Sequence, residues 1–436
     1  MKRQASNTVV TARRAAKFMF GAAALLTMSM LQTPAHAQAL ASFNDSVGEH
    51  VVFIGEDGHV HQTFCGPPLP CNNGTNWNNQ MDLTRMTNGP TNGPWAGSPH
   101  PRLASYADSH GEHIFAADAN NNVYQFFSAN GWSWRSESLG VQDVGGMSGY
   151  SATSTTTTDY LFYETSNQHV HMLASSNGTS FGDTDLSAAS GATSILAEYG
   201  TTFASFHDAG GEHVFYEGTN HHLYEIYSSW QYYTICSIFG CRAYPFLSSV
   251  NQDLTNQTHG PLVARIGTSL IDATGESVFY LGQDSHLHEV QNSSAGWFDL
   301  DLTITARAAL PYGSFQGPGQ TSLSNPLGRQ LFFLGTDLNV HDVLLSTDED
   351  VTTLAKAPLV YPCAGAALTG FTNASTPGQV ESVVFYVAND GSVHKLSQVG
   401  YELTFSGRTF WLAAGWTDLN VIPYSFDVHP MNYCIQ

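Results

Sequence analysis

Pairs of histidines separated by one residue recur along the chain, at His59 and His61, His169 and His171, and His286 and His288. On an extended strand this spacing places two imidazoles on one face, roughly 6–7 Å apart, where they could chelate a metal ion. No carboxylate or third histidine follows the pairs at a fixed offset. Other segments carry polar residues without an imidazole at the first position, namely Asn122, Asn339 and Ser392. The pattern therefore favours histidines that hydrogen-bond within the fold, and we expect neither a metal nor another cofactor.

Familiar hydrolase motifs are absent from the chain. It contains no Ser-x-Asp-x-Gly-x-x-Trp box, no Gly-x-Ser-x-Gly elbow and no His-Glu-x-x-His. The two carboxylates of a glycosidase are defined by their separation in space, which sequence spacing does not give. If the chain were an enzyme, unique rather than repeated residues would carry the chemistry, such as the irregular segment 228–250 or the acidic run 348–350. We therefore expect a protein without catalytic residues.

A short phrase that recurs about seven times must position these side chains. It reads Gly-Glu-His-Val-Phe-Tyr, then a few residues rich in Asn, Asp and Gly, then Val or Leu followed by His or Tyr. The anchors that close the phrase are His61, Tyr124, His171, Tyr224, His288, His341 and His394. These anchors lie about 55 residues apart on average, and a fixed period of this size indicates a repeat architecture.

Each repeat is predicted to form four short strands. The first resembles residues 40–45, and the second is the alternating Glu-His-Val-Phe-Tyr segment. A turn such as Asp57-Gly58 leads into the third strand, and the fourth ends near Asp-Leu-Thr. Seven four-stranded meanders without an intervening helical pattern predict an all-β, seven-bladed β-propeller of antiparallel blades.

Residues 1–37 are predicted to be a signal peptide. Five basic residues accompany an apolar stretch at 18–31, and Ala35-His36-Ala37 is a small-x-small cleavage site. The apolar stretch is too short for a stable membrane anchor. The remaining residues, 38–436, are expected to form a single propeller domain. We therefore expect a bacterial protein that is secreted or periplasmic.

The mature chain is strongly acidic. Removing residues 1–37 leaves 10 Lys and Arg against 36 Asp and Glu, a net charge near −26. Such a surface repels nucleic acids and anionic membranes, so neither is an expected partner. Oligomer formation is compatible with this composition.

Six cysteines lie in the mature part, an even number that suits an oxidising compartment. Cys65 and Cys71 are close in sequence, as are Cys236 and Cys241, and both pairs fall in the loop that leaves the third strand. We expect two local disulfides there. The remaining two cysteines, Cys363 and Cys434, are predicted to pair and tie the C-terminus to the last repeat.

The repeat resembles the fungal fucose-binding lectin propellers and their bacterial seven-bladed relatives, over nearly the whole mature chain. In that family, sugars bind in clefts between blades. A second-strand Arg and a third-strand Glu or Gln, twelve residues apart, bind hydroxyls, and a Trp or Tyr stacks on the sugar. The matching pairs here are His50/Gln62, His113/Gln125, His213/Glu225, Ser277/Glu289, Gln330/Asp342 and, with one extra residue, Ser382/Lys395. The aromatic candidates are Trp77, Trp132, Trp134, Trp230, Trp297 and Trp416.

The chain departs from that family at the second-strand position, where no repeat carries Arg. Histidine can donate only one hydrogen bond to a hydroxyl, so the bidentate fork of a guanidinium is missing. The resemblance thus implies glycan binding at several clefts, with fucose itself in question and with neutral or cationic sugars favoured by the acidic surface. His213, Glu225 and Trp230 of the fourth repeat form the most lectin-like set. The alternatives are a secreted polysaccharide-degrading propeller enzyme and a protein-binding propeller scaffold.

Overall fold

The computed structural model describes residues 40–422, apart from gaps at 56, 67–70, 72–75, 78–79, 92–102, 144, 154–156, 193–202, 238–239, 273–274, 313–318, 345–346, 362–367, 375 and 406–407. The predicted signal peptide and the cysteines Cys363 and Cys434 lie outside these residues. Within the described part of the chain, no helix has the length and apolar character that a bilayer crossing requires.

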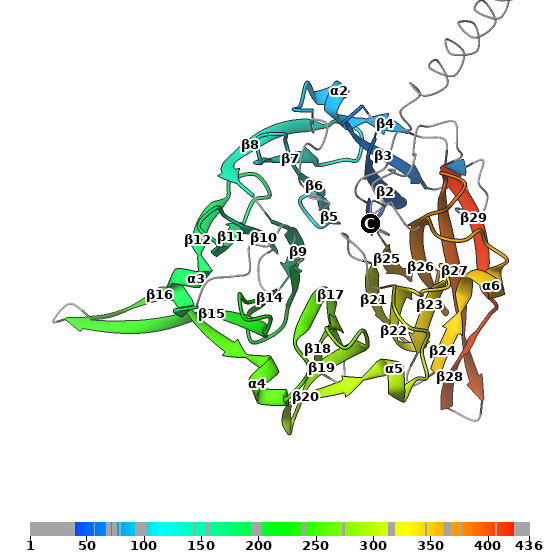
Figure 1. Ribbon diagram of the computed structural model, residues 1–436. Helices are drawn as coiled ribbons and strands as arrows, with labels where there is room; N and C mark the ends of the chain where they lie inside the picture. The colour runs from blue at the N-terminus through cyan, green and yellow to red at the C-terminus, as the bar shows by residue number, and fades with distance from the viewer. Residues whose placement is uncertain are drawn as a thin grey trace, which may run out of the picture. The chain divides into compact units, whose positions relative to one another are not determined.

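The described residues form seven antiparallel sheets, each built from consecutive strands (Figure 1). Blade 1 contains β1 (Leu40–Asn44), β2 (Glu49–Ile54), β3 (Val60–Cys65) and β4 (Met81–Asp82). Blade 2 contains β5 (Leu103–Ala107), β6 (Glu112–Ala117), β7 (Asn122–Ser128) and β8 (Arg135–Gln142). Blade 3 contains β9 (Met147–Thr153), β10 (Thr157–Glu164), β11 (Val170–Ser175) and β12 (Gly182–Asp185). Blade 4 contains β13 (Ala204–His207), β14 (Glu212–Glu217), β15 (Leu223–Ser237) and β16 (Gly240–Asp253). Blade 5 contains β17 (Val263–Asp272), β18 (Gly275–Gly282), β19 (Leu287–Ser293) and β20 (Gly296–Asp301). Blade 6 contains β21 (Gln320–Asn325), β22 (Gly328–Leu334), β23 (Val340–Leu344) and β24 (Thr347–Asp350). Blade 7 contains β25 (Thr369–Asn373), β26 (Gln379–Val387), β27 (Val393–Phe405), β28 (Arg408–Ala413) and β29 (Thr417–Ile422).

The first strand of every blade contacts the first strand of the next, and β25 of blade 7 contacts β1 of blade 1. The blades therefore close into a ring around their innermost strands, as Figure 1 shows. The anchors occupy equivalent positions in it: His61 faces Phe53, Tyr224 faces Tyr216 and His394 faces Tyr386 on the second strands. The predicted all-β, seven-bladed propeller is confirmed.

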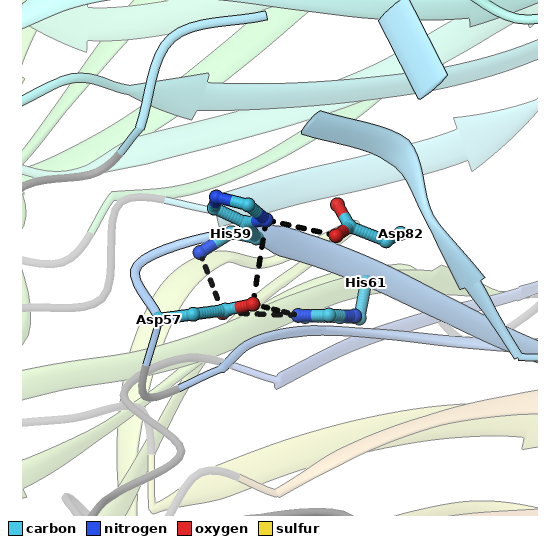
Figure 2. A group of neighbouring side chains, drawn as sticks. All are labelled: Asp57, His59, His61 and Asp82. Carbon is cyan, nitrogen blue, oxygen red and sulfur yellow. Dashed lines mark hydrogen bonds and ion pairs between the residues drawn. The ribbon is translucent and has the colours of Figure 1, made fainter. Parts of the chain in front are cut away.

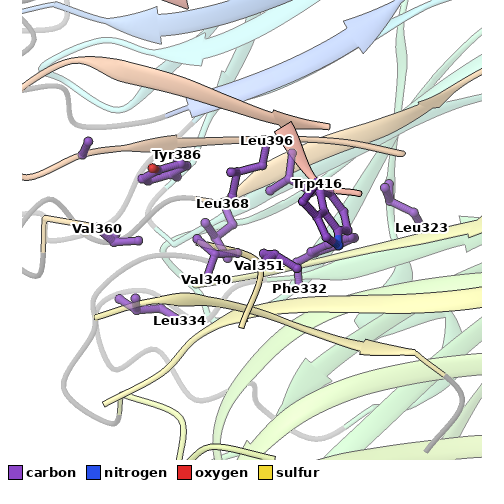
Figure 3. Close-up of a cluster of buried hydrophobic side chains, with 12 residues drawn as sticks. Leu323, Phe332, Leu334, Val340, Val351, Val360, Leu368, Tyr386, Leu396 and Trp416 are labelled. Carbon is purple, nitrogen blue, oxygen red and sulfur yellow. The ribbon is translucent and has the colours of Figure 1, made fainter. Parts of the chain in front are cut away.

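Buried apolar clusters between blades hold the ring together. Because both faces of each sheet pack against a neighbour, consecutive residues of a second strand are all buried, as in Glu49–Ile54. The cluster between blades 6 and 7 includes Phe332, Tyr386 and Trp416 (Figure 3). A similar cluster joins Phe53 of blade 1 to Phe385 of blade 7. Each fully buried ring of this size stabilises the fold by roughly 1.5–3 kcal/mol.

The Asp-Leu-Thr motif does more than end the fourth strand. In blade 1, the carboxylate of Asp82 accepts a hydrogen bond from the backbone N–H of Arg85 and caps a one-turn helix. Thr84 accepts a hydrogen bond from the backbone N–H of Val60 at the start of the third strand. Four further blades repeat this capped turn, so the described helices are α2 (Leu83–Thr87), α3 (Leu186–Ser190), α4 (Leu254–Thr258), α5 (Leu302–Thr305) and α6 (Val351–Ala355). The sequence pattern located the motif but did not predict these helices.

Blades 4 and 7 carry long hairpins. In blade 4, β15 and β16 pair continuously out to Ser237 and Gly240. In blade 7, β27 first pairs with β29 as the fourth strand and then extends to pair with β28. The segment 228–250 is thus a regular hairpin rather than an irregular insertion.

The two local disulfides, Cys65–Cys71 and Cys236–Cys241, are confirmed. Both lie between the third and fourth strands of their blades, but their surroundings differ. Cys65 is buried beside the cluster between blades 1 and 7, whereas Cys236 and Cys241 lie near the tip of the blade 4 hairpin.

Connections at the two ends of the blades differ because the strands form a meander. We call the end with the first-to-second and third-to-fourth strand connections the loop face. The other end, with the second-to-third turns and the passages between blades, is the linker face.

Candidate functional site

Most of the polar pairs predicted from the twelve-residue spacing meet in the structure. In blades 1, 2, 4, 5 and 6, the second-strand residue hydrogen-bonds to its third-strand partner. The bonds are Gln62 to His50 (2.7 Å), Gln125 to His113 (2.8 Å), His213 to Glu225 (2.5 Å), Ser277 to Glu289 (2.7 Å) and Gln330 to Asp342 (2.7 Å). The residues of these pairs are buried. They form the inner wall of each blade junction rather than an exposed surface.

Each junction adds a polar residue from the following blade. That residue lies at the start of the second strand, four positions before the residue that faces the anchor: Glu49, Glu112, Asp159, Glu212, Glu276, Arg329 and Ser382. Gln62 of blade 1 donates to Glu112 of blade 2 at 2.8 Å. Arg329 of blade 6 donates to Ser277 of blade 5 at 2.6 Å and also to Glu289. Neighbouring blades are therefore joined by polar side chains as well as by apolar packing.

The extra blade 7 residue changes this pattern at the last junctions. Ser382 donates to Gln330 of blade 6 at 2.5 Å instead of contacting Lys395. The Lys395 ammonium instead donates to Glu49 of blade 1 at 2.7 Å and lies 3.1 Å from Glu381. The predicted pair Ser382/Lys395 is thus divided between two junctions.

The histidines of blades 1, 2 and 4 share one environment. His50 is stacked between Phe43 and Phe64, at ring-centroid distances of 4.6 and 5.3 Å. Because the amide of Gln62 donates to Nδ1 of His50, the ring N–H is on Nε2, which donates to Asp45 at 3.1 Å. The ring is therefore held in one tautomer and one orientation.

The blade 4 pair differs from those of blades 1 and 2, because the carboxylic acid Glu225 replaces the neutral glutamine as the partner of the histidine. Burial alone opposes a charged imidazole, but the hydrogen bond to Glu225 and the negative charges of Glu225, Glu276 and Asp208 together outweigh it and raise the pKa of His213. Burial also raises the pKa of Glu225, against the effect of His213. The pair is therefore suited to share one proton in its buried position.

Several buried oxygen atoms at the junctions have no hydrogen-bond partner among the described residues. They include Oε1 of Gln62 and Glu112 at the junction of blades 1 and 2, with others at Gln125, Glu225 and Asp342. A buried acceptor without a partner costs about 1–3 kcal/mol. These atoms are the available acceptors of the junctions.

The candidate tryptophans fall into three groups. Trp77 and Trp416 are buried in the apolar clusters, and Trp134 and Trp297 are partly buried against others. Only Trp132 and Trp230, which are 58% and 54% exposed, present a ring to solvent among these candidates.

Trp132 lies at the junction of blades 1 and 2, on the loop face. Its ring makes an edge contact with Phe64 of blade 1 at 5.2 Å. The preceding residue, Gly131, sits so close to Glu112 that an added methyl group would lie 2.5 Å from its Oε1. This junction therefore brings together His50, Gln62 and Glu112 beneath an exposed tryptophan.

The structure does not bring Trp230 to the blade 4 pair. The Trp230 indole bonds to the side chain of Tyr160 in blade 3. His213 and Glu225 instead interact with Glu276 of blade 5. The two sets lie at different junctions because successive side chains of a strand point to opposite faces of the blade.

The His-x-His pairs lie at the linker face, at the opposite end of the strands. Each pair is within reach of the aspartate that caps the helix after the fourth strand, and Figure 2 shows this for His59, His61, Asp57 and Asp82. A metal ion could be held by the groups Asp57, His59, His61 and Asp82; Asp284, His286, His288 and Asp301; and His169, His171 and Asp185. No fixed offset marks these aspartates in the sequence, because fourth strands that follow at different distances bring them to the pairs.

The acidic run 348–350 is largely engaged in structure. Asp348 bonds to His341 at 3.0 Å, and Asp350 caps α6 by accepting a hydrogen bond from the Thr353 N–H. Glu349 is exposed. This run therefore gives no support to a catalytic carboxylate pair.

No protein-family model matches the chain, and no curated protein matches it significantly. Solved structures to which it is similar include AofleA from Arthrobotrys oligospora, at 11% identity and a TM-score of 0.45 over 74% of this chain and 89% of that one. A lectin from Aleuria aurantia, described as a six-bladed β-propeller, is 12% identical with a TM-score of 0.40 over 88% and 95% of the two chains. The SapL1 lectin in complex with alpha methyl fucoside is 12% identical with a TM-score of 0.40 over 90% and 97%.

Proposed function

We propose that this protein is a secreted lectin that binds glycans at its blade junctions and carries out no chemistry. The supporting observation is the junction of blades 1 and 2, where an exposed Trp132 rests on Phe64 above the polar group of His50, Gln62 and Glu112. An exposed aromatic ring held rigidly beside hydrogen-bonding groups suits the apolar face and hydroxyls of a sugar.

The polar group has two roles in this proposal. It holds blades 1 and 2 in register, which fixes the position of Trp132. It also contains two buried acceptors, Oε1 of Gln62 and Oε1 of Glu112, which have no partner among the described residues and which a hydroxyl would reach once the side chains above them shift. The junction of blades 3 and 4, with the exposed Trp230, is the second proposed site.

The remaining features of the proposal concern strength, specificity and location. Each site lacks a guanidinium at the sugar, so each is expected to be weak, and useful affinity would come from several sites acting together. A mature chain with a net charge near −26 disfavours acidic glycans. Cleavage of residues 1–37 would deliver the protein outside the cytoplasm, where its disulfides are stable.

A glycan array on the purified protein, followed by affinity measurements on variants, tests the proposal. Trp132→Ala should lower binding to the best neutral glycan at least tenfold, with little change in melting temperature because the ring is mostly exposed. Phe410→Ala is the matched control, since Phe410 is similarly exposed on the blade 7 hairpin. Equal loss in both variants, or no glycan bound by the wild-type protein, would refute the proposal.

A further inference from the structure

We propose that the linker face carries divalent transition-metal sites, formed by the His-x-His pairs together with aspartates of the same blade. Blades 1 and 5 offer two tight sites, and blade 3 offers a weaker one. This inference is independent of glycan binding, because the sites lie at the other end of the strands from Trp132.

The blade 1 group has the composition and compactness of a metal site (Figure 2). Nδ1 of His59 lies 2.8 Å from Oδ2 of Asp82 and 3.3 Å from Oδ2 of Asp57. Nε2 of His61 lies 3.1 Å from Oδ1 of Asp57. Four ligands at about 2.1 Å around a tetrahedral ion are about 3.4 Å from one another, so small side-chain shifts would suffice to admit it.

Blade 5 reproduces this arrangement. Nδ1 of His286 lies 2.7 Å from Asp301, and Nε2 of His288 lies 3.2 Å from Asp284. The other ring nitrogen of His288 is 3.0 Å from Asp299. A carboxylate on the far nitrogen is the arrangement that orients metal-binding histidines, and it makes the coordinating nitrogen a better donor.

Blade 3 has one ligand fewer. Asn167 stands where blades 1 and 5 have Asp57 and Asp284. His169 lies 2.7 Å from Asp185, and Nε2 of His171 lies 3.7 Å from the same carboxylate, with no hydrogen-bond partner in the part of the chain that the structure describes. Three ligands and an amide at the fourth position predict weaker binding.

Blade 6 shows which side chain is sufficient for folding at the position of the first histidine. There Asn339 replaces the histidine, and its amide donates to Asp350 at 2.9 Å, as His59 does to Asp82 in blade 1. Ser392 occupies the position in blade 7. An amide therefore suffices to link the turn to the capping aspartate. The fold does not require a histidine at this position, so the paired imidazoles of blades 1, 3 and 5 are available for another role.

The ligand chemistry identifies the class of ion. Two imidazoles with two carboxylates suit Zn²⁺ and its neighbours in the transition series, whereas Ca²⁺ and Mg²⁺ prefer sites made only of oxygen. Binding would replace the present hydrogen bonds between histidine and aspartate. The ion would tie the turn between the second and third strands to the start of the helix after the fourth strand.

Titration of the chelator-treated protein with Zn²⁺ alone tests the proposal. We expect two tight equivalents and a weaker third, a rise in melting temperature with Zn²⁺, and no effect of Ca²⁺. His59→Asn and His286→Asn should each remove one tight equivalent, and the double variant should lose both. In EDTA their melting temperatures should match the wild-type value, because blade 6 already uses Asn339 in this way.

Two further variants keep the outcome decisive. His222→Asn is the matched control. His222 forms a hydrogen bond with Asp253 at 2.9 Å, but two positions later the chain has Tyr224 instead of a second histidine. It should leave the tight equivalents unchanged. If the histidine variants fold poorly, Asp57→Asn with Asp284→Asn replaces them, since Asn167 accepts the same backbone hydrogen bond in blade 3. A wild-type protein that retains no Zn²⁺, or a double variant that retains both equivalents, overturns the proposal.

Discussion

The Glu-His dipeptide of the repeated phrase divides its two side chains between neighbouring blades. In blade 2, Glu112 accepts a hydrogen bond from Gln62 of blade 1, while His113 bonds to Gln125 of its own blade. This division follows from the two-residue period of a strand. It explains why both residues recur, although neither is exposed.

The within-blade partners could be predicted from sequence because two adjacent strands and a tight turn fix a constant spacing. The partner from the next blade could not be predicted. Gln62 and Glu112 are separated by 50 residues, and their contact depends on how two sheets pack. The exposure of Trp132 and the burial of Trp77 depend on that packing as well.

Asp342 gives a prediction about pH. Burial raises the pKa of its carboxyl from 3.8 to about 8. The folded state therefore keeps a proton that the unfolded chain releases near pH 4, so this group lowers stability as pH rises from about 4 to about 8 and adds nothing further above that. The free energy of unfolding of Asp342→Asn should rise relative to that of the wild type across this window, by up to about 6 kcal/mol. Urea unfolding at pH 5 and pH 8.5 measures the gain, and a difference that is the same at both pH values contradicts the assignment.

At the scale of elements, the sequence predicted the strands well and the one-turn helices not at all. The strands carry alternating or continuously apolar patterns, as in Glu212–Glu217. A helix of five residues such as Leu83–Thr87 is too short to show a helical period. Its signal is instead the capping Asp82 and the Thr84 hydroxyl, whose partner is in the third strand.

The glycine that opens the repeated phrase is required by a close approach of two strands. In blade 5, a methyl group on Gly275 would lie 2.1 Å from the carbonyl oxygen of Asn292, and its φ of +129° is unfavourable for other residues. Gly275→Ala should therefore destabilise the protein by about 2–4 kcal/mol. Gly415→Ala is the control, because nothing lies within 4 Å of the added methyl group there. Thermal unfolding compares the two, and equal melting temperatures would contradict this explanation of the repeat.

At the scale of the whole molecule, the ring closes where the first and last blades meet. In the described residues neither blade contributes a strand to the sheet of the other, so side chains must hold them together. The junction uses the apolar cluster of Phe53 and Phe385, the hydrogen bond between Ser42 and Thr369, and the buried ion pair of Lys395 and Glu49. The number of blades could be predicted from the repeat count, but this closing ion pair could not. Pairing of Cys363 with Cys434, which lie outside the described residues, stays a prediction.

The closing ion pair predicts a large effect of removing one partner. Lys395→Met leaves Glu49 buried beside Glu381 without its cation, and should cost about 3–5 kcal/mol in the free energy of unfolding. Glu49→Gln in the same chain removes the unpaired charge and should restore most of the loss. Urea denaturation of the single and double variants measures both effects. A single variant within 1 kcal/mol of wild type would show that the pair is not needed for closure.

The central claim is that the junction of blades 1 and 2 holds a sugar against Trp132. A crystal structure of the protein with the neutral sugar that binds best in the array tests it most directly. We predict a pyranose ring stacked on the exposed face of Trp132, beside Phe64 of blade 1, and no density there in crystals of Trp132→Ala. A sugar bound only elsewhere on the molecule, or bound unchanged in the Trp132→Ala crystals, would contradict the account.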